Sequence, residues 1–114
     1  LTSSDGITWT SRTSGTTSDL NDVEYVNDLF ISVGAGGTIL TSSDGISWTS
    51  KTSPTGYTLN SIAYGNGTLV AVGGAYNKAI IVTSSDNGAN WTTRMDGQNT
   101  SFDERWHAGK KYST

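Results

Sequence analysis

Short apolar runs, separated at regular intervals by polar turn residues, set the pattern of this chain. Leu29-Phe30-Ile31 and Leu69–Val72 are apolar without a polar residue at every second position, which is typical of strands buried on both faces of a sheet. No stretch shows the period of an amphipathic helix. Eight strands are expected, at Asn21–Val26, Leu29–Val33, Thr38–Ser42, Ile46–Ser50, Asn60–Tyr64, Thr68–Val72, Ala79–Ser84 and Asn90–Arg94. The turn signals between them are Asn27-Asp28, Gly34–Gly37, Asn66-Gly67 and Gly73-Gly74.

An internal repeat underlies this pattern. Asp5 and Asp44 lie 39 residues apart, and a third Asp, Asp86, follows 42 residues later. Residues 1–14 and 40–53 differ at only two positions. Four short strands in a repeat of about 40 residues are typical of a β-propeller blade, so an all-β fold is predicted.

A Ser-Asp-Gly turn followed by a Trp occurs once in each repeat. The Asp carboxylate can accept hydrogen bonds from backbone N–H groups one or two residues on, and the Gly can adopt the positive φ of a tight turn. The Ser hydroxyl can cap another turn donor, and the Trp is expected to be buried. We interpret these turns as structural, the alternative being a cation or ligand site. Their residues are Ser3, Asp5, Gly6 and Trp9; Ser42, Asp44, Gly45 and Trp48; and Ser84, Asp86, Gly88 and Trp91.

The pattern Ser-x-Asp-x-Gly-x-x-Trp resembles the Asp-box, a BNR-like repeat of sialidase-like and photosystem II assembly factor-like propellers. Residues 84–91 match it at every position, and the two earlier copies are one residue shorter. The resemblance covers most of residues 1–94. It implies propeller blades of four antiparallel strands, but it implies little about activity because a fold does not fix a function.

The two ends of the chain each predict half a blade. Residues 1–13 supply the third and fourth strands of one blade, and residues 99–114 supply the first and second strands of another. Full blades are expected at residues 18–53 and 58–94. Residues 1–114 are thus predicted to form one propeller module of two full blades plus two complementary half-blades, and the chain could be a processed or cut piece.

Ring closure is the expected consequence of these half-blades. A propeller closes with about four to eight blades, and an unpaired strand edge promotes association with other chains. Two chains arranged head to tail would form a six-bladed homodimer in which each copy completes the split blade of the other. The alternatives are a fragment of a longer propeller and, more remotely, a nine-bladed trimer.

Composition narrows the possible functions. The net charge of −3 argues against a nucleic-acid partner. The sequence has no run of 18 apolar residues, the length that a membrane-spanning helix needs. The chain contains no Cys, so disulfides and thiolate chemistry are excluded. This composition fits a bacterial surface protein or a cytoplasmic one, and an extracellular or cell-surface location is slightly favoured.

The loops on one face are the expected ligand-binding surface. Tyr57 and Tyr76 fall in these loops, and Tyr76 is followed by Asn77 and Lys78. An exposed ring beside amide and ammonium donors is typical of a sugar-binding site. The alternative is that both rings fill gaps between blades.

Carboxylates and further aromatic residues complete the candidates. Asp22 and Glu24 lie on an expected inner strand, where they could bind a cation or a sugar, or could simply face a solvated channel. Other aromatic residues are expected in the core by position: Trp9, Tyr25, Trp48, Tyr64, Trp91 and Trp106.

No catalytic arrangement is evident, so we expect a non-enzymatic binding or scaffold module without a cofactor or metal, with a glycan or a protein as its ligand. A sialidase-like glycoside hydrolase, the rival hypothesis, needs an Arg cluster, a Tyr nucleophile and an acid. Arg12 and Arg94 each lie three residues after the Trp of a Ser-Asp-Gly turn, on expected outer strands far from the channel. Arg105 is then the one arginine left for such a cluster. His107 is the only histidine and has no second ligand at metal-binding spacing.

Overall fold

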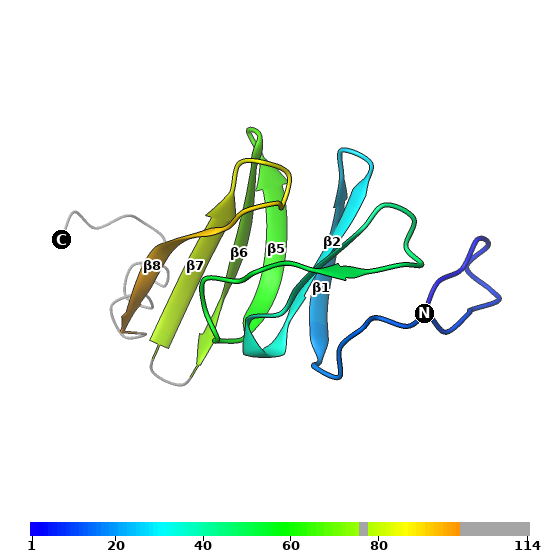
Figure 1. Ribbon diagram of the computed structural model, residues 1–114, viewed down its shortest axis with the longest axis horizontal. Helices are drawn as coiled ribbons and strands as arrows, with labels where there is room; N and C mark the ends of the chain where they lie inside the picture. Colours follow the sequence, from blue (N-terminus) through cyan, green and yellow to red (C-terminus); the bar gives the residue numbers. More distant parts are fainter. Residues whose placement is uncertain (76–77, 99–114) are drawn as a thin grey trace.

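Two four-stranded antiparallel sheets stand side by side in the computed structural model, which describes residues 1–75 and 78–98 (Figure 1). We call them blade 1 and blade 2. In both, each strand pairs with the next strand along the chain. Blade 1 consists of β1 (Leu20–Val26), β2 (Leu29–Gly34), β3 (Ile39–Ser42) and β4 (Thr49–Ser50). Blade 2 consists of β5 (Leu59–Gly65), β6 (Thr68–Ala75), β7 (Lys78–Ser84) and β8 (Thr92–Gln98). The predicted all-β fold of four-stranded blades is confirmed.

A two-residue turn joins the first two strands of each blade, β1 to β2 and β5 to β6. Asn27 and Asp28 have φ angles of 52° and 62°, and Asn66 and Gly67 have φ angles of 52° and 75°. Positive φ at both central residues is the conformation of a type I′ turn, whose twist matches that of the strands it joins. Asn, Asp and Gly tolerate this conformation better than other residues, so the sequence signal and the structure agree.

The outer strand of blade 1 is shorter than the pattern predicts. β4 contains only Thr49–Ser50, whereas Ile46–Ser50 was the expected strand. The reason is that the backbone N–H groups of Ile46 and Ser47 donate to the carboxylate of Asp44 and not to a neighbouring strand.

Blade 2 extends further than the pattern predicts. Gly73 and Gly74 were expected to form a turn, but both lie inside β6, whose ladder with β7 continues until Ala75 pairs with Lys78. β8 likewise continues to Gln98. The paired glycines therefore mark a place where backbones approach closely: a Cβ at Gly73 would collide with the carbonyl group of Thr58.

The Gly34–Gly37 segment contains a short turn, η1 (Ala35–Gly37), in which Gly36 has a non-helical φ of 68°. A Cβ on Gly37 would collide with the carbonyl group of Thr55, and the φ of Gly37 is 78°, so both space and conformation favour glycine there. In the described ranges, no helix is both long enough and apolar enough to cross a membrane.

The hydrophobic core lies between the two blades. Cross-strand partners point to the same side of a sheet, so each blade has a front face and a back face that the pairing register defines. The front face includes Val23, Ser32 and Leu40 in blade 1 and Ile62, Ala71 and Val82 in blade 2. The back face of blade 1, with Ile31, Val33 and Ile39, packs on the front face of blade 2, with Leu59, Ile62, Leu69, Ala71, Ile80 and Val82.

A short hairpin at residues 1–13, the N-terminal hairpin, lies beyond blade 1 (Figure 1). Thr2 and Thr10 exchange two backbone hydrogen bonds of 2.8 and 2.7 Å. Arg12 Nε donates to Thr2 Oγ1 at 2.8 Å, and Arg94 Nε donates in the same way to Thr83 Oγ1 in blade 2 at 2.9 Å. The hairpin thus has the hydrogen bonds of the two outer strands of a blade. Residues 99–114, the other predicted half-blade, lie outside the described residues.

Candidate functional site

The first two Ser-Asp-Gly turns share one hydrogen-bond pattern. In the third, Asp86 Oδ1 accepts one backbone N–H, from Asn90 at 2.9 Å, and Asp86 Oδ2 accepts the side-chain amide of Asn90 at 2.7 Å. In the second turn, Ser42 Oγ donates to Asp44 Oδ1 at 3.0 Å and accepts the N–H of Gly45 at 2.8 Å. Asp44 Oδ1 also accepts the N–H groups of Ile46 and Ser47, at 2.8 and 3.0 Å. The Asx-type turn predicted from the sequence is confirmed, although the donors lie two and three residues beyond the Asp.

These hydrogen bonds favour the ionised Asp. The backbone N–H of Asn90, its side-chain amide and the hydroxyl of Ser84 lower the pKa of Asp86 from 3.8 to about 2. Backbone N–H donors of their own turns also lower the pKa of Asp5 and Asp44. Each carboxylate is thus engaged by its own turn. Among the residues that the structure describes, no group of three acidic or histidine side chains could hold a metal ion.

The Trp side chains that follow these turns differ in burial. Trp9 is 56% exposed and Trp48 is half-buried, whereas Trp91 is only 8% exposed within the core. The indole N–H groups of Trp48 and Trp91 donate to the carbonyls of Gly45 and Gly88, at 3.3 and 3.0 Å. The predicted burial is confirmed for Trp91 and wrong for Trp9, because the N-terminal hairpin has no complete blade around it in the described part of the chain.

Tyr25 and Tyr64 are also more exposed than the repeat predicts. Tyr25 is 57% exposed and packs its ring against Phe30, with 4.5 Å between ring centroids. The hydroxyl of Tyr64 accepts a hydrogen bond from the amide of Asn27 at 3.4 Å. Both rings lie near the turn ends of their strands, where water reaches them, so their assignment to the core was wrong. Trp106 lies outside the described residues.

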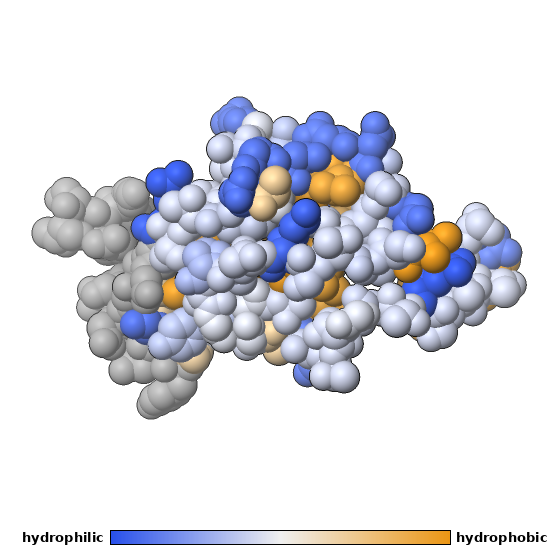
Figure 2. All heavy atoms as spheres, viewed as in Figure 1, coloured by the Kyte–Doolittle hydropathy of each residue, from blue (hydrophilic) through white to orange (hydrophobic). Residues whose placement is uncertain are grey.

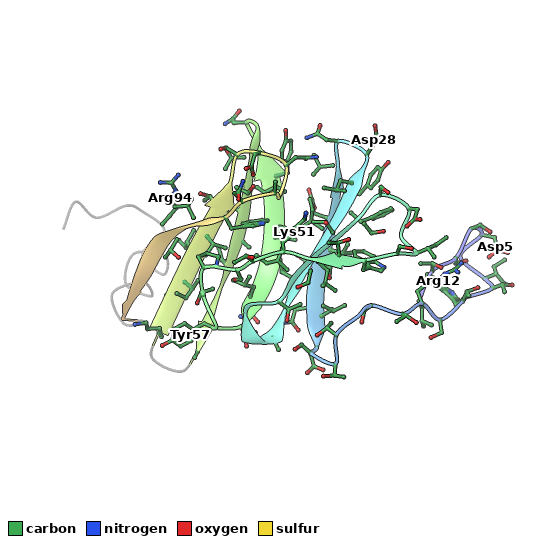
Figure 3. The ribbon with its side chains drawn as sticks, viewed as in Figure 1. Asp5, Arg12, Asp28, Lys51, Tyr57 and Arg94 are labelled. Carbon is green, nitrogen blue, oxygen red and sulfur yellow. The ribbon has the colours of Figure 1, made fainter. Side chains whose placement is uncertain are left out.

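The expected ligand-binding loops lie together at one edge of the blades. Figure 3 shows Tyr57 at this loop edge and Asp28 at the opposite edge, where the two-residue turns lie. Lys78 Nζ lies 5.7 Å from the centroid of the Tyr57 ring, close enough for a cation–π contact. Lys78 is the first residue of β7 and not a loop residue. Tyr76 and Asn77 lie outside the described residues.

A hydrogen-bonded loop holds the backbone of Tyr57. Ser53 Oγ accepts the N–H of Thr55 at 3.3 Å, and Thr55 Oγ1 accepts the N–H of Tyr57 at 3.1 Å. The same pattern occurs at residues 14–18, where Ser18 takes the place of Tyr57. The loop geometry therefore repeats, but the aromatic ring does not.

The acidic pair on β1 lies elsewhere, on the back face of blade 1. Asp22 Oδ2 accepts the N–H of Ile62 at 2.9 Å and the hydroxyl of Ser61 at 3.3 Å. Glu24 lies on the same face of β1 and is half-buried. The structure thus gives the Asp22 carboxylate a role in joining blade 1 to blade 2, and it places Tyr57 and Lys78 together at the loop edge.

Two asparagines that the sequence interpretation missed also join the blades. Asn21 Nδ2 donates to the carbonyl of Leu59 at 2.9 Å, and Asn27 Nδ2 donates to Asn87 Oδ1 at 3.2 Å. The signal that could have found them is the repeat itself, because Asn recurs 39 residues later in both cases, at Asn60 and Asn66.

The arginines required by the hydrolase hypothesis do not meet. Arg12 lies on the N-terminal hairpin and Arg94 on β8, and both lie far from Tyr57 (Figure 3). Each is bonded to a Thr of the neighbouring strand. Arg105 and His107 lie outside the described residues.

Comparison with known proteins agrees with the architecture. A family model described as the DUF6242 beta propeller domain matches residues 1–104, which include both blades and the N-terminal hairpin. No curated protein and no solved structure matches the chain. The family match and the two four-stranded antiparallel sheets support the same conclusion: the chain belongs to the DUF6242 beta propeller domain family.

Proposed function

We propose that this chain is a non-enzymatic, Asp-box-type propeller module that assembles head to tail with a second copy into a six-bladed ring. The observation that carries the proposal is the N-terminal hairpin. It has the hydrogen bonds of two outer strands, but no residue in ranges 1–75 and 78–98 pairs with it as an inner strand. Open strand edges promote association, and a head-to-tail contact that closes into a ring leaves none.

The solution mass of the intact chain tests this assembly. We expect a mass near twice the 12.0 kDa of one chain, measured by light scattering over a range of concentrations. A mass near three times that value would replace the six-bladed ring by a nine-bladed one. A single-chain mass at every concentration would refute the assembly.

The loop edge is the proposed ligand-binding surface, for a glycan or a protein. Tyr57 is 37% exposed, and the ammonium group of Lys78 lies 5.7 Å from the centroid of its ring. A sugar can stack its apolar face on such a ring while its hydroxyls find polar partners. A glycan array of wild type and Tyr57→Ala tests this, with Tyr25→Ala as the control because Tyr25 is exposed at the turn end. Binding that survives in Tyr57→Ala would argue against this surface.

A glycoside hydrolase domain is the rival function. The bonds of Asp22 to blade 2 and the positions of Arg12 and Arg94 on outer strands support a binding module instead. A panel of chromogenic glycosides separates the two hypotheses. Turnover that disappears in Asp22→Asn or Glu24→Gln would replace the binding module by an enzyme.

A further inference from the structure

The front face of blade 1 is open where the front face of blade 2 is covered. Val23 on β1 is 52% exposed, whereas Ile62, which holds the same position in blade 2, is 5% exposed. Leu20 is exposed and its equivalent Leu59 is fully buried. Towards the outer strands the front face of blade 1 is covered, since Leu40 on β3 is buried. The opening is therefore concentrated over β1.

A hollow of about 270 Å³ lies between this opening and the N-terminal hairpin. Leu20, Val23 and Phe30 line it on blade 1, and Leu1 and Arg12 line it on the hairpin. Apolar atoms reach the surface at this end of the molecule (Figure 2). If the hairpin is the outer pair of strands of a preceding blade, the inner strands of that blade would lie at this hollow.

The length and sequence of residues 99–114 fit this place. The inner hairpin of blade 1 spans Leu20–Gly34, and residues 99–114 are one residue longer. When Trp106 is aligned with Tyr25, Tyr112 takes the position of Ile31 on the back face. A large side chain at that position would face the front of blade 1, as Ile31 faces the front of blade 2.

Residues 99–114 cannot reach the hollow of their own chain. Residues 99–114 follow β8 in blade 2, whereas the hollow lies between blade 1 and the N-terminal hairpin. Sheets pack about 10 Å apart, so the chain would have to cross about 20 Å. At about 3.3 Å per residue this takes about six residues, which leaves too few for both inner strands.

We propose that residues 99–114 of a second copy form the two inner strands in this hollow, pair with the N-terminal hairpin and cover β1. The inference rests on the proposed head-to-tail assembly and specifies its interface. The contact is heterologous, because the surface that receives strands and the segment that donates them are different parts of the chain.

A charge on the receiving surface tests the interface in the full chain. Val23→Asp places a carboxylate where a partner strand would bury it, while the free chain keeps it in water. We expect its dissociation constant to rise by more than about tenfold, because burying an unpaired charge costs more than the ~1.4 kcal/mol that corresponds to tenfold. Leu20→Ser should weaken association in the same direction. The matched control is Ile46→Asp, an exposed apolar position on the Ser-Asp-Gly turn, which should leave the mass unchanged.

Mixing two defective chains tests the direction of exchange. Tyr112→Asp impairs the donated segment and Val23→Asp impairs the receiving surface, so each variant alone should be monomeric. Their mixture has one intact interface and should form a dimer. A monomeric wild type overturns the assembly and the interface together. A wild-type oligomer that Val23→Asp does not weaken, or a mixture that stays monomeric, overturns the interface and leaves the assembly standing.

Discussion

One residue type, the Trp that follows each Ser-Asp-Gly turn, occurs at three degrees of burial. Trp91 lies in the core between the blades, Trp48 is half-buried and Trp9 is mostly exposed. The sequences around Trp9 and Trp48 are almost identical, yet the two residues differ in exposure, so the local motif does not determine burial. Burial depends on what packs around the ring, and Trp91 belongs to the cluster of buried apolar side chains that both blades contribute.

We expect the cost of replacing these Trp residues by Ala to follow their burial. Trp91→Ala should lower the unfolding free energy by about 3–5 kcal/mol, the range for large aromatic residues in cores, and Trp9→Ala by less than about 1 kcal/mol. Trp48→Ala should fall between them. Urea unfolding in a Val23→Asp background, which removes the effect of association, measures all three. Equal losses would contradict the assigned burial.

Because of the Ser-Asp-Gly turns, the unfolding free energy should fall as the pH is lowered in the acid range. The folded pKa of Asp86, about 2, lies below its ordinary value of 3.8, so this carboxylate contributes stability above about pH 4. The contribution is lost as the pH falls from 3.8 towards 2. Urea unfolding at pH 5, 3.5 and 2.5 should show this decline in the wild type and a flatter profile in Asp86→Asn. Identical profiles would show that the turn does not stabilise the ionised form.

Asp22 should contribute to stability by joining the blades. Removing its carboxylate leaves the N–H of Ile62 without its acceptor, and hydrogen bonds to charged groups contribute about 1.5–3 kcal/mol. Asp22→Ala should therefore lower the unfolding free energy by about 1–2 kcal/mol, given that the site is only partly buried. Asp22→Asn, which keeps one oxygen, should lose less. Asp19→Ala, at an exposed position before β1, is the control.

Individual strands show which parts of the fold the sequence predicts. The β1–β2 and β5–β6 hairpins follow directly from apolar runs joined by Asn-Asp and Asn-Gly turns. The β4 strand is shorter than predicted because a carboxylate competes for its backbone donors. The β6–β7 ladder is longer because glycines, usually a turn signal, can also permit close contact between backbones.

The close contact at Gly73 gives a test within β6. A methyl group there would meet the carbonyl of Thr58, so Gly73→Ala should lower the unfolding free energy by about 1–3 kcal/mol, as overpacking does. Gly65→Ala on β5 is the matched control, because nothing lies within 4 Å of its Cβ position. Thermal unfolding followed by circular dichroism compares the two. A Gly73→Ala variant as stable as Gly65→Ala would place β5 and β6 further apart than described.

The candidate site illustrates a different limit of prediction. The Ser-Asp-Gly turns are local, so their hydrogen bonds could be predicted from sequence spacing alone. Asp22 on blade 1 accepts a hydrogen bond from Ile62 on blade 2. Tyr57, in the loop before β5, contacts Lys78 on β7. Such contacts depend on how sheets stack, which a one-dimensional pattern does not specify.

Considered as a whole, the molecule should gain stability from association. A partner that binds only the folded chain raises its unfolding midpoint with concentration. We therefore expect the midpoint temperature of the wild type to rise across a hundredfold increase in concentration. The midpoint of Val23→Asp should stay constant, since its receiving surface is blocked. A wild-type midpoint that does not change with concentration would contradict self-association.

Each blade has a front face that differs from its back face, and this difference affects how the sequence can gain further repeats. A tandem duplication of one 39-residue period inserts a unit whose two sides already fit its new neighbours, and the near identity of residues 1–14 and 40–53 agrees with such an event. No fresh contact surface has to evolve for each added copy. The constraint on growth is angular, because the rotation from one copy to the next has to add up to a full turn.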